Sequence, residues 1–406
     1  MNTPELTSQQ QKLLQFPFSE KIMLTGPAGS GKTTAGVARL QQMVGNGVPA
    51  RSILVLLPQR SLAIPYAQAI QDPEFPAGGE PAVLTLGGLG QRMIALFWPL
   101  IARNSGFAHP NQPPQFLTLE SAQYFLARVV QPFLSRGYFE NITLDPNRLY
   151  SQILDNLNKS AVVGFPVDQI GSRLKQAWVG SKTQLTVYDQ AQECALAFRS
   201  YCLQNNLLDF SLQFELFTHS LWNTLLCRQY LIGKYRHLIY DNVEEDVPVA
   251  HDLIAQWLPE MNSALFIQDD EGGFRSFLGA DPKSAQELDG KVDTRIHFDQ
   301  TFDQSPAVEG FRQVLIRSLR EKSLSKTNVN EWKDTFEVQS FRFYPEMLNW
   351  AVTRTGELIG KGIRPDEICI LSPFLSDSLR FSLVDRFNRA GLPAKTFRPS
   401  RSLKDE

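Results

Sequence analysis

Short apolar runs recur between residues 22 and 270, and glycine, proline or acidic residues follow each of them. Runs of this length that end at turn-forming residues are typical of buried strands. After the first run, apolar residues recur at helical spacing from Lys32 to Val44, and Gly45 and Gly47 end the pattern. The order strand, helix, strand predicts parallel strands joined by a crossover. The five predicted strands are 22–24, 52–58, 82–90, 235–242 and 263–270.

A long stretch between the third and fourth predicted strands has helical periodicity and few strand signals. Its clearest helices are 121–134 and 188–208, and we expect a helical insertion in an α/β domain. A second α/β unit follows, with strands at 335–343 and 367–373 and helices at 346–362 and 377–391; its sheet is barely begun, so we expect a fragment. The predicted divisions are the first sheet domain in two parts, 1–105 and 206–285, the insertion 106–205, and the second domain 286–406.

Composition and charge fit a globular chain of several domains. The chain has 406 residues, more than one ordinary core accommodates, with 43% hydrophobic and 20% charged residues. The net charge of −2 excludes a uniformly basic surface, although a local basic groove is compatible with it.

The cysteines and the N-terminus favour a cytoplasmic protein. Cys194, Cys202, Cys227 and Cys369 lack C-x-x-C spacing, so we expect free, mostly buried thiols in a reducing compartment. No apolar run is long enough to span a membrane, and the polar N-terminus lacks the apolar core of a signal peptide.

The sequence GPAGSGKTT, at 26–34, fits the phosphate-binding pattern G-x-x-x-x-G-K-[ST] between a strand and a helix. Its glycines let successive amides face phosphate oxygens, and the helix that follows directs its positive end toward them. Lys32 is predicted to contact the β- and γ-phosphates, and the Thr33 hydroxyl to hold Mg²⁺. The predicted ATP-binding residues of the loop are Gly26, Pro27, Ala28, Gly29, Ser30, Gly31, Lys32, Thr33 and Thr34.

A site of this kind needs an acidic metal ligand at the end of a neighbouring strand. The fourth predicted strand ends at Asp241, which we therefore expect to be the second Mg²⁺ ligand. The alternative is a simple turn, because Asp-Asn is a common turn pair.

The order of motifs resembles the UvrD/Rep/RecB group of superfamily I DNA helicases, which includes the AddB-type helicase-nuclease subunits. Gln10 matches the family's adenine-reading glutamine, Thr85 a DNA-contact threonine, and Asp241 the acidic box hhhDExQD. The segments that carry the resemblance are LTSQQQKLL (6–14), ILVLLPQRSLA (53–63), VLTLGGLGQRMI (83–94), NNLLDFSLQFELF (205–217), LIYDNVEED (238–246), LFIQDDEGGFRSFLGAD (265–281) and EICILSPFLSDSLRFSLVDRFNRAGLP (367–393).

The resemblance implies two RecA-like P-loop NTPase domains that use ATP and Mg²⁺. It also implies single-stranded or partly duplex DNA as the partner, a role in DNA repair or recombination, and a nucleoid-associated location in a bacterium. A partner helicase or nuclease subunit is implied by the AddB-type members.

Several departures from the family pattern predict weakened hydrolysis. Asn242 stands where the family has the glutamate that activates water, and Gly272 stands where it has the glutamine that senses the γ-phosphate. Pro373 occupies a position where the family has an arginine. Glu244 and Glu245 are the remaining candidates for a catalytic base beside Lys32 and Asp241.

The predicted DNA contacts follow the third and fifth strands. Single strands are held by polar groups on phosphates and by aromatic rings on bases. The predicted DNA-binding residues are Arg60, Thr85, Arg92, Phe274 and Arg275, with Phe97, Trp98 and Phe277 as further aromatic candidates. Core packing explains Phe97 and Phe277 at least as well. Taken singly, Arg60 and Arg275 also fit solvated surface charges.

Three functions are compatible with these residues. The first is an ATP-driven DNA helicase or translocase, and the second is a non-hydrolysing ATP-binding scaffold in a helicase-nuclease complex. A P-loop kinase or switch protein that does not act on DNA is the third, which the helicase-like order of motifs disfavours.

Overall fold

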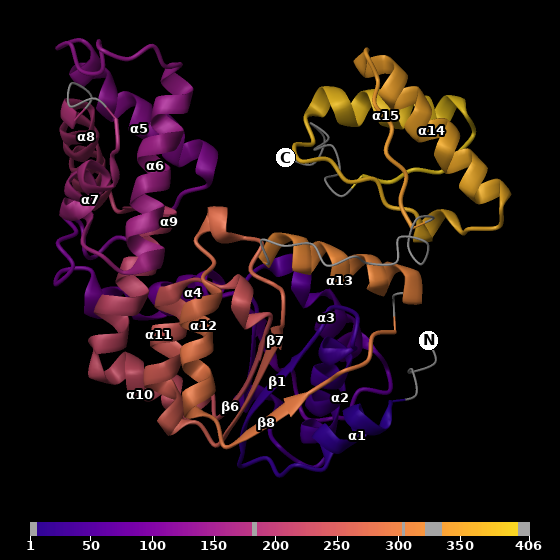
Figure 1. Cartoon of the computed structure of the whole chain (residues 1–406). Helices are drawn as coiled ribbons and strands as arrows, with labels where there is room; N and C mark the ends of the chain where they lie inside the picture. Colours follow the sequence, from indigo (N-terminus) through magenta and orange to yellow (C-terminus); the bar gives the residue numbers. More distant parts are fainter. Residues whose placement is uncertain (1–5, 181–184, 303–304, 321–334, 397–406) are drawn as a thin grey trace. The chain divides into compact units, whose positions relative to one another are not determined.

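The computed structural model describes residues 6–180, 185–302, 305–320 and 335–396. The chain divides into two compact units, Met1–Asp303 and Gln304–Glu406. The first unit is built on a six-stranded sheet in the order β3-β2-β6-β7-β1-β8, in which every pairing is parallel (Figure 1). This confirms the predicted α/β class. The strands are β1 (Lys21–Gly26), β2 (Ile53–Leu56), β3 (Ala82–Leu84), β6 (His237–Asp241), β7 (Ser263–Asp269) and β8 (Thr294–His297).

Apolar residues on both faces of the strands explain why the sheet is covered on both sides. In β1, Ile22 and Leu24 lie in one buried cluster, whereas Met23 between them lies in the other. One face is covered by α1 (Ser8–Leu14), α2 (Lys32–Gly45) and α3 (Ile64–Gln71). The opposite face is covered by α4 (Leu86–Ile101), α10 (Leu225–Lys234), α11 (Pro248–Trp257) and α12 (Pro282–Gln286) (Figure 1).

The helical insertion extends from the sheet domain between β3 and β6. A two-stranded parallel ladder, β4 (Gln115–Phe116) with β5 (Leu207–Leu208), joins its entry to its exit. β5 begins two residues after the predicted limit at 205, and β4 begins nine residues after the predicted limit at 106. Its helices are α5 (Leu119–Leu134), α6 (Pro146–Val163), α7 (Ile170–Ala177) and α8 (Leu185–Gln204).

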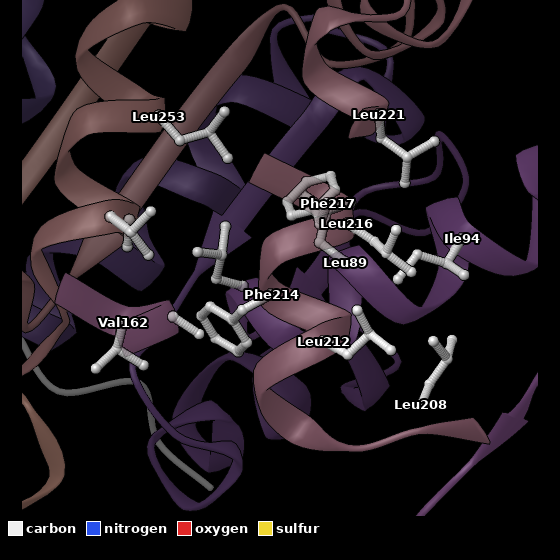
Figure 2. Close-up of a cluster of buried hydrophobic side chains, with 14 of the residues drawn as sticks. Leu89, Ile94, Val162, Leu208, Leu212, Phe214, Leu216, Phe217, Leu221 and Leu253 are labelled. Carbon is white, nitrogen blue, oxygen red and sulfur yellow. The ribbon is translucent and has the colours of Figure 1, made fainter. Parts of the chain in front are cut away.

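The insertion is joined to the sheet domain by a continuous apolar core. After β5 the chain forms α9 (Phe210–Glu215), which continues as the π-helical turn η5 (Leu216–Leu221). Figure 2 shows Leu212, Phe214 and Phe217 from this segment among side chains of α4, α6 and α11. Because one core connects the two parts, α9 positions the insertion relative to the carboxyl ends of the strands.

Two sequence-based predictions about the sheet domain need correction. The third strand stops at Leu84 rather than continuing to residue 90, because Thr85 caps α4 by accepting a hydrogen bond from the Gly88 amide at 3.0 Å. The first domain also extends beyond the predicted boundary at 285. β8 pairs with β1, so residues 294–297 complete the first sheet.

The second unit contains the predicted helices but not the predicted strands. Its helices are α13 (Pro306–Arg320), α14 (Tyr344–Gly360) and α15 (Asp377–Arg389). No strand forms within the described parts of 335–343 and 367–373. Strands require a hydrogen-bonded neighbour, and these segments remain exposed, with Val338 78% and Leu371 87% accessible.

Among the described residues, no helix is long and apolar enough to cross a membrane. Cys194, Cys202 and Cys227 are buried free thiols, and Cys369 is an exposed one, which agrees with the predicted thiol state.

Candidate functional site

The loop between β1 and α2 has the backbone geometry of a phosphate cradle. Gly29 and Gly31 have φ values of 76° and 74°, a left-handed conformation that side chains disfavour. A Cβ on Gly26 would lie 2.6 Å from the Phe298 carbonyl oxygen, so only glycine fits there. Because α2 begins at Lys32, the amides of its first turn have no intrahelical acceptor and are available for an anion.

Lys32 is buried and held inside this loop. Its Nζ donates hydrogen bonds to the carbonyls of Gly26 at 2.9 Å and Pro27 at 2.7 Å, and to Ser30 Oγ at 3.3 Å. The ammonium group also forms an ion pair with Asp269, the last residue of β7. Asp269 had appeared in the sequence only as part of a motif match. The parallel register places it beside Gly26, which explains the contact.

Gln10 braces the loop from α1. Its Oε1 accepts a hydrogen bond from the Thr7 amide at 3.0 Å, and its Nε2 donates to the Gly31 carbonyl at 3.2 Å. A Cβ on Gly31 would lie 2.2 Å from the same Nε2 atom. The structure thus brings Gln10 to the predicted site, where its carboxamide supports the backbone of the loop.

A guanidinium group fixes the chain between α1 and β1. Arg39, on α2, is 3% exposed and donates hydrogen bonds to the carbonyls of Phe16 at 2.5 Å and Pro17 at 2.8 Å. Its guanidinium also lies 4.5 Å from the centroid of the Phe18 ring. Arg39 was not predicted as a functional residue, although an arginine on the apolar face of a helix is a signal for such a role.

Asp241, at the end of β6, has one oxygen without a partner. The Tyr66 hydroxyl donates to its Oδ2 at 2.9 Å, whereas Oδ1 is buried and accepts no hydrogen bond of ordinary geometry. Burial raises the pKa of this carboxyl, and the nearby Tyr66 and Thr33 hydroxyls partly offset the effect. An orphaned carboxylate oxygen near a threonine hydroxyl fits a cation ligand pair. Tyr66 was not predicted.

The residues after Asp241 take an unusual path. Asn242 adopts a left-handed conformation, with φ 57° and ψ 48°, which asparagine tolerates better than glutamate. Glu244 is 1% exposed, and neither of its carboxylate oxygens accepts a hydrogen bond of ordinary geometry. Burial raises its pKa to about 8; the Asp269 carboxylate adds to the rise, and the nearby backbone amides of Glu244 and Asp269 partly oppose it. Position 242 therefore lacks a carboxylate, while Glu244 carries one next to Asp269.

Glu245 is engaged in a structural role. Its carboxylate accepts hydrogen bonds from the amides of Gly273 at 2.7 Å, Phe274 at 2.9 Å and Arg275 at 3.0 Å. Three donors satisfy this carboxylate and hold the turn after β7. The geometry therefore favours Glu244 over Glu245 among the two predicted bases.

We predict that Glu244→Gln stabilises the chain at alkaline pH. The folded chain retains a proton that the unfolded chain releases above about pH 4.5, so the wild-type free energy of unfolding falls as the pH rises from there toward 8. Glutamine removes this loss, so the variant should gain on the order of 2 kcal/mol at about pH 8.5 and much less at about pH 5. Urea denaturation of both chains at the two pH values measures the difference, and a gain independent of pH would contradict the assignment.

A cavity of about 490 Å³ at the carboxyl ends of β2 and β3, which we call the Thr85 groove, brings together Arg60, Thr85 and Arg92. A second cavity, of about 610 Å³, is lined by Thr85, Arg275 and Phe277, and also by the carboxylates of Asp155, Asp209, Glu245 and Asp246. Three of the five predicted DNA-binding residues therefore line the Thr85 groove, and Arg275 lines the more acidic second cavity.

The predicted aromatic contacts separate into two groups. Phe274 and Phe277 are 80% and 74% exposed on the turn that Glu245 holds, so core packing does not explain them. Trp98 is buried in the core and donates to the Gln112 carbonyl at 2.6 Å, and Phe97 packs edge-on against Tyr230. The structure therefore removes Trp98 from the DNA-contact candidates.

Comparison with protein-family models and with curated proteins found no match to the chain. Among the described residues, no group of three or more His, Cys, Asp or Glu side chains is arranged to hold a metal ion. A metal at this site would therefore depend on Thr33, Asp241 and oxygens of a bound ligand.

Proposed function

We propose that the chain binds ATP with Mg²⁺ in the loop 26–34. The supporting observation is the convergence of the free amides of α2, the Lys32 ammonium and the unpartnered Asp241 oxygen at the carboxyl edge of a parallel sheet. Thr33 and Asp241 would hold the cation, which neutralises phosphate charge when bound. When nucleotide binds, the Lys32 ammonium group would leave its ion pair with Asp269 and contact the phosphates instead.

We further propose that the chain is a helicase- or translocase-like protein of the UvrD/Rep/RecB type that acts on single-stranded DNA. In support, the sheet is consistent with a RecA-like P-loop domain, and the insertion leaves it after β3. The Thr85 groove gathers two arginines and a threonine at the carboxyl edge that also holds the P-loop. Such a groove suits a strand whose phosphates meet cations.

A second candidate, the non-hydrolysing scaffold, is favoured by one specific observation. Asn242 has no carboxylate and a left-handed backbone, so the usual base is missing in both chemistry and conformation. A measurement of ATP turnover therefore distinguishes the helicase or translocase from the non-hydrolysing scaffold.

The distinguishing experiment measures ATPase turnover of the chain with and without a single-stranded oligonucleotide. DNA-stimulated turnover supports the motor, and nucleotide binding without turnover supports the scaffold. Turnover unaffected by DNA, with transfer to another acceptor, would support a kinase. Asp241→Asn should weaken the Mg²⁺-dependent part of nucleotide affinity, because it replaces an anionic ligand by a neutral one.

We predict that charge reversal in the Thr85 groove weakens DNA binding. The double variant Arg60→Glu/Arg92→Glu should lower affinity for a labelled single-stranded oligonucleotide by about 10- to 100-fold and reduce the salt dependence of binding. Fluorescence anisotropy over a range of salt concentrations measures both effects. Arg51→Glu is the matched control, because Arg51 is exposed at the opposite, amino end of β2. An equal loss of DNA affinity in Arg51→Glu would show that the Thr85 groove is not the DNA-binding site.

A further inference from the structure

An unpaired buried carboxylate lies beside the Lys32–Asp269 ion pair. Glu244 follows β6, the strand next to β7, and the Asp269 carboxylate is close enough to perturb it. Burying a carboxyl group without hydrogen-bond partners costs free energy, so an unsatisfied one beside the ion pair of the phosphate loop indicates a functional role. Nothing in the proposed mode of nucleotide binding uses this group.

Glu244 occupies the space that a side chain at position 272 would need. A Cβ on Gly272 would lie 2.5 Å from Glu244 Cγ and 2.6 Å from Oε1. The helicase resemblance places a γ-phosphate-sensing glutamine at this position. The Glu244 carboxylate therefore lies along the path that such a glutamine would follow, but it comes from the neighbouring strand.

The other nearby carboxylates are engaged. Glu245 binds three backbone amides, and Asp246 accepts from the Tyr240 hydroxyl at 2.7 Å and the Val247 amide at 2.9 Å. Asp241 accepts from Tyr66 and is the expected cation ligand. Among the described residues of this loop, Glu244 alone has two carboxylate oxygens without partners.

Building on the proposed MgATP site, the geometry points to Glu244 as the catalytic base that replaces both Asn242 and the missing glutamine at 272. The oxygen of a water molecule forms a bond to the γ-phosphorus, and the bond from that phosphorus to the β,γ-bridging oxygen breaks. The bridging oxygen keeps the electron pair and leaves on ADP. Glu244 accepts a proton only in its ionised form, so turnover should rise with pH as this carboxyl, whose pKa is about 8, loses its own proton. One proton of the water then passes to a Glu244 oxygen and is later released to solvent, so the products are ADP and inorganic phosphate.

The direct test is Glu244→Gln, which preserves shape and removes the base. The turnover number for MgATP should fall about 100-fold or more, because general bases contribute factors of that size. The dissociation constant for a fluorescent ATP analogue should change less than about threefold, because Glu244 lies outside the phosphate loop. Glu260→Gln, at an exposed glutamate before β7, should retain wild-type turnover within about threefold. Urea denaturation at about pH 8.5, where Glu244→Gln is predicted to be more stable than the wild type, shows whether the variant folds.

A second pair of variants tests the geometry without changing the base. Gly272→Ala places a methyl group against the Glu244 carboxylate and should lower turnover while leaving nucleotide affinity unchanged. Gly290→Ala is the matched control, because a Cβ there meets no atom within 4 Å.

The possible outcomes separate this inference from the proposed function. Turnover that survives Glu244→Gln would overturn the inference, as would a wild-type chain that binds MgATP but never hydrolyses it. Absence of MgATP binding would instead overturn the proposed nucleotide site itself.

Discussion

Lys32→Ala should weaken MgATP binding by about 100-fold or more. The ammonium group is buried in the phosphate loop, already directed by three hydrogen bonds to loop oxygens, and truncation would remove the cation that meets the β- and γ-phosphates. Isothermal titration of ATP with Mg²⁺ into the wild-type and variant chains measures the difference.

Two controls distinguish lost phosphate binding from a damaged fold. Lys12→Ala removes an exposed lysine on α1 and should leave MgATP affinity unchanged. The loss of Lys32 also leaves Asp269 without its ion-pair partner, so adding Asp269→Asn should recover part of any lost stability but none of the lost affinity. Wild-type affinity in Lys32→Ala would show that the loop does not hold phosphates.

Arg39→Met should lower the free energy of unfolding by about 2 to 4 kcal/mol. Methionine fills much of the same volume but leaves the Phe16 and Pro17 carbonyls, and the weaker acceptors Leu13 and Leu14, without their donor. Urea denaturation followed by tryptophan fluorescence measures the change.

Arg51→Met is the matched control for this prediction. Arg51 is exposed in the short 3₁₀ turn before β2, so its replacement should change stability by less than about 0.5 kcal/mol. Because Arg39 also anchors the segment between Gln10 and β1, its variant should bind nucleotide less tightly. If Arg39→Met were as stable as the control, the Arg39 hydrogen bonds would make no measurable contribution to stability.

Strands of the sheet could be predicted where an apolar run ends at a turn-forming residue. They could not be predicted where strand formation depends on a hydrogen-bonded neighbouring strand. β1, β2, β6 and β7 are buried runs that end in glycine, proline or acidic residues. β8 alternates half-buried with exposed residues at the sheet edge, so no continuous apolar run marks Thr294–His297. At 335–343 and 367–373 the local pattern favours strands, but no neighbouring strand pairs with them in the described residues.

The phosphate loop was visible in the sequence because its glycines and lysine act through local geometry. The contacts that surround it were not, because they join distant segments. Tyr66 reaches Asp241 across 175 positions, and Glu244 meets Gly272 only because β6 and β7 are neighbours. The left-handed backbone of Asn242 and the hydrogen bonds that engage Glu245 also depend on tertiary structure. Motif spacing in the sequence therefore could not predict them.

The site depends on one physical premise, that free amides and a single buried ammonium group can replace the hydration of a triphosphate at the sheet edge. The most direct measurement is a titration of the chain with ATP in the presence and absence of Mg²⁺. We predict saturable binding that Mg²⁺ strengthens and that Lys32→Ala weakens by about 100-fold or more. No saturable binding of ATP in either condition would contradict it.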